Sequence, residues 1–252
     1  MSNMSKQSYL MEEMSWPEVE TALEEVEAAI IPVGSHEQHG PHLAESCDSD
    51  RAEKFARLLA ERLYPRVLVT PTVNFGVSYH HMKFPGTITL SPETFISLLF
   101  DIARSLHQHG LERIIIFNAH GGNDAPIDVA IEKIRQAFPV RLTAFKHSDF
   151  IEDFIDSKVE SETYGHACEY EVSEMLYLAP EKVKKDKLTP GEVLDFAGEY
   201  LKSPARIGAD FAELTANGAL GDATLASREL GEEIITEALD EVVKYIEKFI
   251  NI

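Results

Sequence analysis

Carboxylate and imidazole side chains follow two apolar runs of this sequence, and side chains of these types bind divalent cations. Three of them come after the run AAIIPV, which ends at Val33: Glu37, His39 and Asp48. A fourth, His120, comes directly after the run RIIIFNA. Both runs are typical of buried strands, and the carboxyl ends of parallel strands meet at one edge of an α/β sheet. The sequence therefore predicts that these groups converge on a metal site.

The spacing of these residues is compatible with a shared centre. Glu37 and His39 are two positions apart, so on an extended or loop backbone their side chains point the same way. The turn expected at Gly40 and Pro41 lets Asp48 return to the same place, where its two oxygens could bridge two cations. A mixed set of imidazole and carboxylate ligands suits Zn²⁺ or Mn²⁺ rather than copper or an iron–sulfur cluster.

Each candidate ligand also has an alternative that involves no metal. Glu37 could be a solvated loop acid, and Asp48 could be the N-cap of a helix that begins near residue 50. His120 could be a hydrogen-bonded histidine at a strand end. We favour a metal site because the groups occur together at two strand exits.

The elements that would position these groups alternate between strand and helix along the chain. The expected strands are residues 28–33, 67–70, 113–119 and 140–145. The expected helices are residues 15–26, 50–64, 91–110, 125–138, 168–178 and 224–249. This alternation predicts a single α/β domain over residues 1–252, with a mostly parallel central sheet flanked by helices on both faces. Residues 152–163 are polar and indicate no clear element, and residues 182–221 suggest a loop or a cap over the site.

Composition narrows the classes of partner. The formal net charge is −20, from 43 acidic and 23 basic residues, which disfavours nucleic acid and anionic membranes as partners. Cys47 and Cys168 are the two cysteines, so no disulfide framework is expected. Residues 1–10 lack the apolar core of a signal peptide, and no run reaches membrane-spanning length. We expect a cytoplasmic protein.

Five motifs, in this order, resemble those of the creatininase (creatinine amidohydrolase) family: GSHEQHGPHL, CDSD, FPGTITLS, NAHGGN and HACEYEVSEML. The resemblance covers the chain from about Ile30 to Leu178. It implies the three-layer fold of that family and hydrolysis of a non-peptide C–N bond in a small amide substrate. It also implies a homo-oligomer, usually a hexamer.

The resemblance further implies two divalent metal ions per subunit, zinc or manganese or both, with iron as an alternative. Glu37, Asp48 and His120 would hold one ion, while His39 and the bridging Asp48 would hold the other. Creatininase completes the second site with a glutamate two residues after the strand-end histidine, where this chain has Gly122. Glu171 is the expected substitute, and Glu169 is the less favoured one.

Catalytic and substrate-binding roles follow from the same resemblance. His166 is expected to protonate the leaving nitrogen. The alternative role of His166 is to orient Glu171. We also expect Glu171 to be a catalytic residue. Four residues are expected to contact the substrate or to admit it to the metals: Gly121, Gly122, Tyr79 and His81.

The chain departs from the family pattern where creatininase holds the creatinine ring. Upstream of His166 the chain has residues 162–164 and no tryptophan, since its single tryptophan is Trp16. Cys47 and Val172 also replace threonines of the motifs. We therefore expect another small cyclic amide or a formamide as the substrate. The alternatives are a formylamino-pyrimidine nucleotide deformylase of flavin or deazaflavin biosynthesis, trimming of a peptide-derived cofactor precursor, opening of an oxidised inositol-type ring, and a non-catalytic metal-binding family member.

Overall fold

Five parallel strands form one sheet in the order β1-β3-β2-β4-β5. The strands are β1 (Tyr9–Leu10), β2 (Ala28–Val33), β3 (Val67–Val69), β4 (Arg113–Asn118) and β5 (Arg141–Phe145). The computed structural model describes residues 8–162 and 164–252. Most of the N-terminal segment 1–10, for which we expected no signal peptide, therefore lies outside the described residues. Thr163, in the stretch 162–164 upstream of His166, lies outside them as well.

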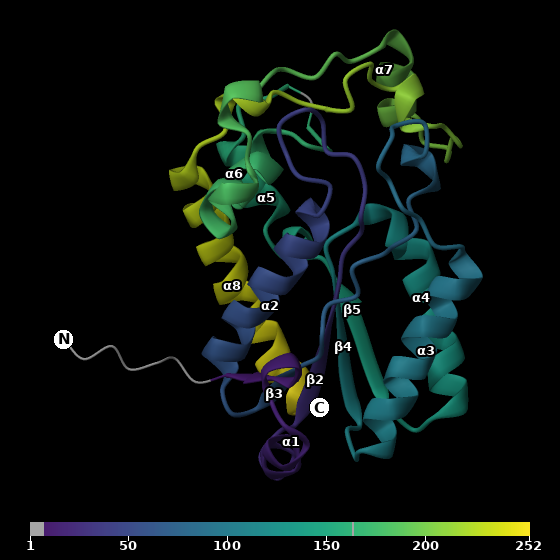
Figure 1. Ribbon diagram of the computed structural model, residues 1–252, viewed down its shortest axis with the longest axis vertical. Coiled ribbons are helices and arrows are strands. Elements are labelled where there is room, and N and C mark those ends of the chain that lie inside the picture. The colour runs from purple at the N-terminus through teal and green to yellow at the C-terminus, as the bar shows by residue number, and fades with distance from the viewer. Residues whose placement is uncertain (1–7, 163) are drawn as a thin grey trace, which may run out of the picture.

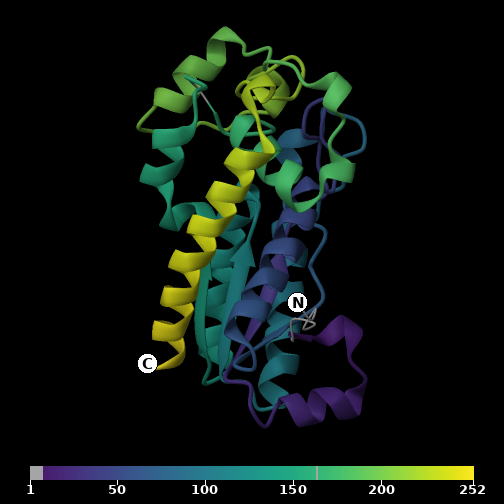
Figure 2. The same ribbon diagram turned by 90° about the vertical axis from the view of Figure 1, so that its left-hand side faces the viewer.

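Helices cover both faces of this sheet, which confirms the predicted fold class (Figure 1). The helices are α1 (Trp16–Ala22), α2 (Cys47–Leu63), α3 (Pro92–Gln108), α4 (Asp124–Ala137), α5 (Glu152–Lys158), α6 (Glu169–Leu178), α7 (Asp195–Lys202) and α8 (Arg228–Ile250). Helices α3 and α4 lie on one face, whereas α2, α6 and α8 lie on the other. Figure 2 shows α8 running lengthwise along its side of the molecule.

The central strands are apolar on both faces because each face is covered. In β2, Ala28 and Ile30 belong to the core under α2 and α8, together with Phe55. Ala29 and Ile31 point the opposite way, into the core under α3 and α4. This alternation follows from the two-residue period of a strand, and continuous apolar runs are typical of buried parallel strands.

The sheet register brings the two motif-bearing strand ends together. Val33, the last residue of β2, is aligned with Asn118, the last residue of β4. The backbone N–H of Ala119 donates to the carbonyl of Val33 at 2.9 Å, which extends this pairing beyond the strands. From β2 the chain continues to β3 on one side, and from β4 it continues to β5 on the other. The crevice between β2 and β4 is therefore a topological switch point, where open α/β sheets bind ligands.

The predicted elements match the structure except in three short segments. The two-residue strand β1, helix α5 within the polar stretch 152–163, and helix α7 within residues 182–221 were not predicted. The helix expected from residue 50 begins at Cys47, and the last helix begins at Arg228 instead of residue 224. No helix among the described residues has both the length and the apolar character needed to cross a membrane.

The packing of α8 on α6 generates a test with a matched control. A Cβ added at Gly231 would lie 1.9 Å from the carbonyl oxygen of Ser173, whereas one added at Gly198 in α7 would meet no atom within 4 Å. We expect Gly231→Ala to lower the free energy of unfolding by about 2 kcal/mol, because overpacking forces backbone shifts. Gly198→Ala should raise it by about 0.5 kcal/mol through the lower entropy of the unfolded chain. Urea unfolding measures both, and equal stability of the two variants would contradict this packing.

Candidate metal centre

Asp48 lies in the first turn of α2 and is 2% exposed. Because the helix begins at Cys47 with Ser46 as its N-cap, the alternative in which Asp48 caps a later helix start is wrong. The side chain instead turns toward the strand ends. Its Oδ1 lies 3.2 Å from His39 Nε2, and its Oδ2 lies 3.2 Å from His120 Nδ1. One carboxylate therefore faces two imidazoles with its two oxygens.

Several atoms at the centre are buried without a hydrogen-bond partner. They are Glu37 Oε1, His39 Nε2 and Asp48 Oδ2. His39 Nε2 lies 3.2 Å from Asp48 Oδ1, and Asp48 Oδ2 lies 3.2 Å from His120 Nδ1, but neither contact has the geometry of a hydrogen bond. Burying such groups unpaired is costly, and divalent cations would supply partners for them. The donor set thus fits divalent metal ions.

Backbone carbonyls select which imidazole nitrogen faces the centre. His39 Nδ1 lies 3.1 Å from the carbonyl oxygen of Glu37, and His120 Nε2 lies 3.1 Å from that of Val77. An N–H that donates to a carbonyl fixes the tautomer and leaves the other nitrogen as the ligand. The nitrogens left over are His39 Nε2 and His120 Nδ1, the two atoms that face Asp48.

Two serines that sequence reasoning missed anchor Glu37. The hydroxyls of Ser35 and Ser78 donate to Glu37 Oε2 at 3.1 and 2.6 Å. His120 Nε2 also lies 3.2 Å from this oxygen, so Glu37 and His120 are neighbours in the structure. Oxygen Oε1 of Glu37 stays without a hydrogen bond and lies 3.3 Å from His81 Nε2.

Glu171 lies at the centre, whereas Glu169 lies outside it. Glu171 Oε2 is 4.0 Å from His39 Nε2 and accepts the backbone N–H of Ala167 at 2.6 Å. Glu169 instead accepts hydrogen bonds from Glu160 and Ser161, so it holds that segment to the start of α6. Of the two candidates for the ligand missing at Gly122, the geometry favours Glu171. Ala167 itself has φ +49°, a conformation rare outside glycine that aims its N–H at this carboxylate.

Electrostatics in the metal-free chain place protons where cations would bind. Burial would raise the pKa of Asp48, but the nearby imidazoles lower it, while Glu37 opposes them. For His120, burial would lower the pKa, and the charges of Glu37 and Asp48 raise it well above its ordinary value. Burial would likewise lower the pKa of His39, but Cys47 and Asp48 raise this pKa well above its ordinary value. Metal ions must displace these protons, so metal binding is coupled to proton release.

The glycines after His120 have different surroundings. A Cβ at Gly122 would lie 2.3 Å from both His120 Nε2 and the carbonyl oxygen of Val77, whereas one at Gly121 would meet nothing within 4 Å. In this backbone conformation position 122 therefore has no room for a side chain.

A cavity of about 190 Å³ opens onto these side chains. The predicted residues that line it are Glu37, Asp48, His81, His120, Gly121, Gly122, His166 and Glu171. Tyr79, which we predicted to contact substrate, is 54% exposed and is not among the described lining residues, although its neighbour His80 is. The cap contributes side chains that sequence reasoning missed: Tyr200, Ala209, Phe211 and Leu214. Residues 182–221 thus form part of the wall of the cavity.

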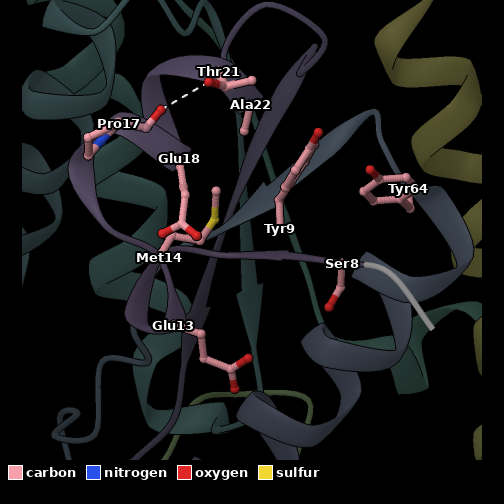
Figure 3. Close-up of a pocket in the computed structure, with 9 residues that line it drawn as sticks. All are labelled: Ser8, Tyr9, Glu13, Met14, Pro17, Glu18, Thr21, Ala22 and Tyr64. Atoms are coloured by element: carbon pink, nitrogen blue, oxygen red, sulfur yellow. Dashed lines mark hydrogen bonds between the residues drawn. The ribbon is translucent and has the colours of Figure 1, made fainter. Parts of the chain in front are cut away.

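A larger cavity, of about 630 Å³, lies near α1 and β1 and differs in chemistry (Figure 3). It is lined by Ser8, Tyr9, Glu13, Met14, Pro17, Glu18, Thr21, Ala22 and Tyr64. It contains two carboxylates but no histidine or cysteine among these residues, and neither carboxylate belongs to a group that could hold a metal ion in the described part of the chain. Its size alone does not make it the functional site.

Comparison with known proteins agrees with this geometry. The family described as "Creatininase: Creatinine amidohydrolase" matches residues 12–246. A mycofactocin precursor peptide peptidase from Mycobacterium ulcerans is 33% identical over 227 residues, covering 87% of this chain and 84% of the relative. A 3-dehydro-scyllo-inosose hydrolase from Thermotoga maritima is 29% identical over 259 residues, covering 94% and 81%.

A solved structure shares the whole fold. The structure named "Creatininase Mn" superimposes with a TM-score of 0.80 at 26% identity, covering 97% of this chain and 99% of that one. The family resemblance predicted from the five motifs is therefore confirmed. With a family match over almost the whole chain and relatives aligned over more than four-fifths of it, this protein belongs to the creatininase family of amidohydrolases.

Proposed function

We propose that this chain is a metal-dependent amidohydrolase that cleaves a non-peptide C–N bond of a small cyclic amide or a formamide at a centre for two divalent cations. The observation that carries the proposal is the position of Asp48, whose two oxygens each lie 3.2 Å from a different imidazole nitrogen. A single carboxylate shared in this way is suited to bridging two cations.

The side chains divide into two ligand sets around Asp48. Glu37 and His120 would hold one ion with it, and His39 and Glu171 would hold the other. When bound, such ions lower the pKa of a shared water toward about 7 and polarise a carbonyl oxygen of the substrate. Zinc and manganese both suit these nitrogen and oxygen donors.

His166 is placed to move the proton that hydrolysis requires. Its Nε2 lies 2.7 Å from the carbonyl oxygen of Gln38, so this nitrogen donates and Nδ1 carries the lone pair. Burial and the charge of His39 lower its pKa to about 4, which keeps the ring neutral at pH 7. Nδ1 lies 3.9 Å from Glu37 Oε1 and lines the cavity. The neutral ring can therefore accept, at Nδ1, the proton released when water attacks the carbonyl carbon, and can then deliver this proton to the leaving nitrogen as the C–N bond breaks. Its hydrogen bond to the carbonyl of Gln38 supports this role over the orientation of Glu171.

The cavity favours a small substrate without a phosphate group. Its volume of about 190 Å³ is below the range of about 300–1,000 Å³ of pockets for drug-sized ligands. No lysine or arginine is among the described residues that line it. A phosphorylated pyrimidine nucleotide would find no cationic partner there, so the deformylase alternative is less well supported. The apolar side chains of Phe211 and Leu214 also line the cavity, and exclusion of water by such groups strengthens electrostatic contacts.

Two substitutions should change metal content in different ways. Asp48→Ala should abolish binding of both ions, because both ligand sets lose the shared carboxylate. His39→Ala should weaken one ion selectively by about 10- to 100-fold. Elemental analysis and calorimetric titration of Mn²⁺ measure the two results. Two full equivalents of tightly bound metal in the Asp48→Ala protein would contradict the shared-carboxylate arrangement.

Substitution of His166 separates proton transfer from metal binding. We expect His166→Asn to lower kcat by about 10²- to 10⁴-fold, the contribution typical of a general acid–base group. Metal stoichiometry should stay unchanged, because His166 is in neither ligand set. Steady-state kinetics beside metal analysis test this expectation, and a kcat within tenfold of the wild-type value would show that another group transfers the proton.

The substrate class can be tested directly with the wild-type protein. Cyclic amides and formamides, with and without phosphate, are incubated with protein loaded with Mn²⁺ or Zn²⁺, and released amine, ammonia or formate is measured. We expect turnover of an unphosphorylated compound, loss of activity after chelation, and recovery when metal is restored. Bound metal without turnover of any compound in the panel would instead support the non-catalytic metal-binding alternative.

A further inference from the structure

A buried arginine lies directly behind the candidate metal centre. Arg51 is one helical turn after Asp48 in α2 and is 4% exposed. Each of its three guanidinium nitrogens contacts a different side chain of α6. Nη1 donates to Glu171 Oε1 at 2.8 Å, Nε donates to Glu174 Oε2 at 2.6 Å, and Nη2 donates to the hydroxyl of Tyr170 at 2.9 Å.

The single positive charge of Arg51 does not neutralise the carboxylates around it. Arg51 carries one positive charge against three buried carboxylates: those of Glu171 and Glu174, to which it donates hydrogen bonds, and that of Asp48, whose Oδ1 lies 3.6 Å from Nη1. Glu174 is fully buried, and its other oxygen, Oε1, lies 2.5 Å from His147 Nε2, so both of its oxygens have partners. The negative charge left over is therefore on Glu171 and Asp48, the two carboxylates that face His39.

The contacts of Glu171 leave one oxygen for the centre. Its Oε1 is held by Arg51, and its Oε2 accepts the N–H of Ala167 at 2.6 Å and lies 4.0 Å from His39 Nε2. With one oxygen held by a planar guanidinium that is itself fixed at three points, the carboxylate has a single orientation. A lysine at this position would keep the charge but could not reproduce the three-way geometry.

We propose that Arg51 is the positioning residue of the second metal ion: it orients Glu171 so that Oε2 completes the ligand set of His39 and Asp48. This inference rests on the proposed dinuclear centre. It explains how a chain with glycine at position 122 still presents a carboxylate to that ion, because the glutamate comes from α6 and its orientation comes from α2. A merely structural arginine would tie these two helices together without selecting one metal site.

Calorimetric titration of Mn²⁺ into the metal-free full-length protein distinguishes these roles. For Arg51→Lys we expect the affinity for one ion to fall by about 10- to 100-fold, as is typical when a group that orients a ligand is removed. The affinity for the other ion, held by Glu37 and His120, should stay within about twofold. Arg57→Lys is the matched control, since Arg57 lies in the same helix with ion pairs to Glu53 and Glu13 but is partly exposed. It should leave both affinities unchanged.

A double-mutant cycle tests whether Arg51 acts through Glu171. Glu171→Gln alone should weaken the same ion, and the combination of Arg51→Lys with Glu171→Gln should cause no further loss beyond Glu171→Gln, because both changes remove one interaction. Additive losses would overturn the proposal, as would equal weakening of both ions in Arg51→Lys or unchanged binding of both. A wild-type protein that binds no second ion would also overturn it.

Folding is monitored by the thermal midpoint of each variant. If Arg51→Lys does not fold, Tyr170→Phe replaces it, since this change keeps the aromatic ring but removes one of the three contacts that fix the guanidinium against Glu171. Affinity for the second ion should then fall selectively, and two wild-type affinities would overturn the proposal. Two tightly bound ions without amide hydrolysis would refute the proposed function while leaving the role of Arg51 to be decided by the same titrations.

Discussion

Three carboxylates are buried together at the carboxyl edge of the sheet, and their mutual repulsion requires positive charge between them. Glu37, Asp48 and Glu171 are at most 8% exposed, and the charge of Glu37 raises the pKa of Asp48 against the effect of the imidazoles. In the metal-free chain, protons on His39 and His120 supply part of that charge, yet several buried oxygen and nitrogen atoms still lack hydrogen bonds. Divalent cations satisfy both needs, which is why this edge of the sheet is suited to a metal centre.

The parallel sheet positions these charged groups and provides the packing that offsets the free-energy cost of burying them. The ends of β2 and β4 are aligned, so the loops that carry Glu37 and His120 leave the sheet side by side. Helix α2 adds Asp48 from its first turn, and α6 adds Glu171, both from the same face of the sheet. The apolar cores on either side hold these elements rigidly, and hydrogen bonds to backbone carbonyls aim the imidazoles. The cost of the charged site is offset by packing elsewhere in the molecule.

The sequence predicted most of the central fold because its strands are continuous apolar runs, which few other structures tolerate. Helices α5 and α7 escaped prediction because they are short and lie in polar or glycine- and proline-containing segments. At the site, histidines and acids in glycine-rich motifs were recognisable by their chemistry. Ser78 and Arg51 were not, since serine and arginine are common residues whose roles arise from partners distant in sequence. Ser78 lies 43 positions from Ser35, and Arg51 lies 120 positions from Glu171.

The central claim is that Asp48 lies between two cations, and anomalous diffraction tests it most directly. Crystals soaked in Mn²⁺ would be measured above and below the manganese absorption edge. The account predicts two anomalous peaks, one on each side of the Asp48 carboxylate, with His120 beside one and His39 beside the other. A single peak away from Asp48, or no peak near it at full metal loading, would contradict the account.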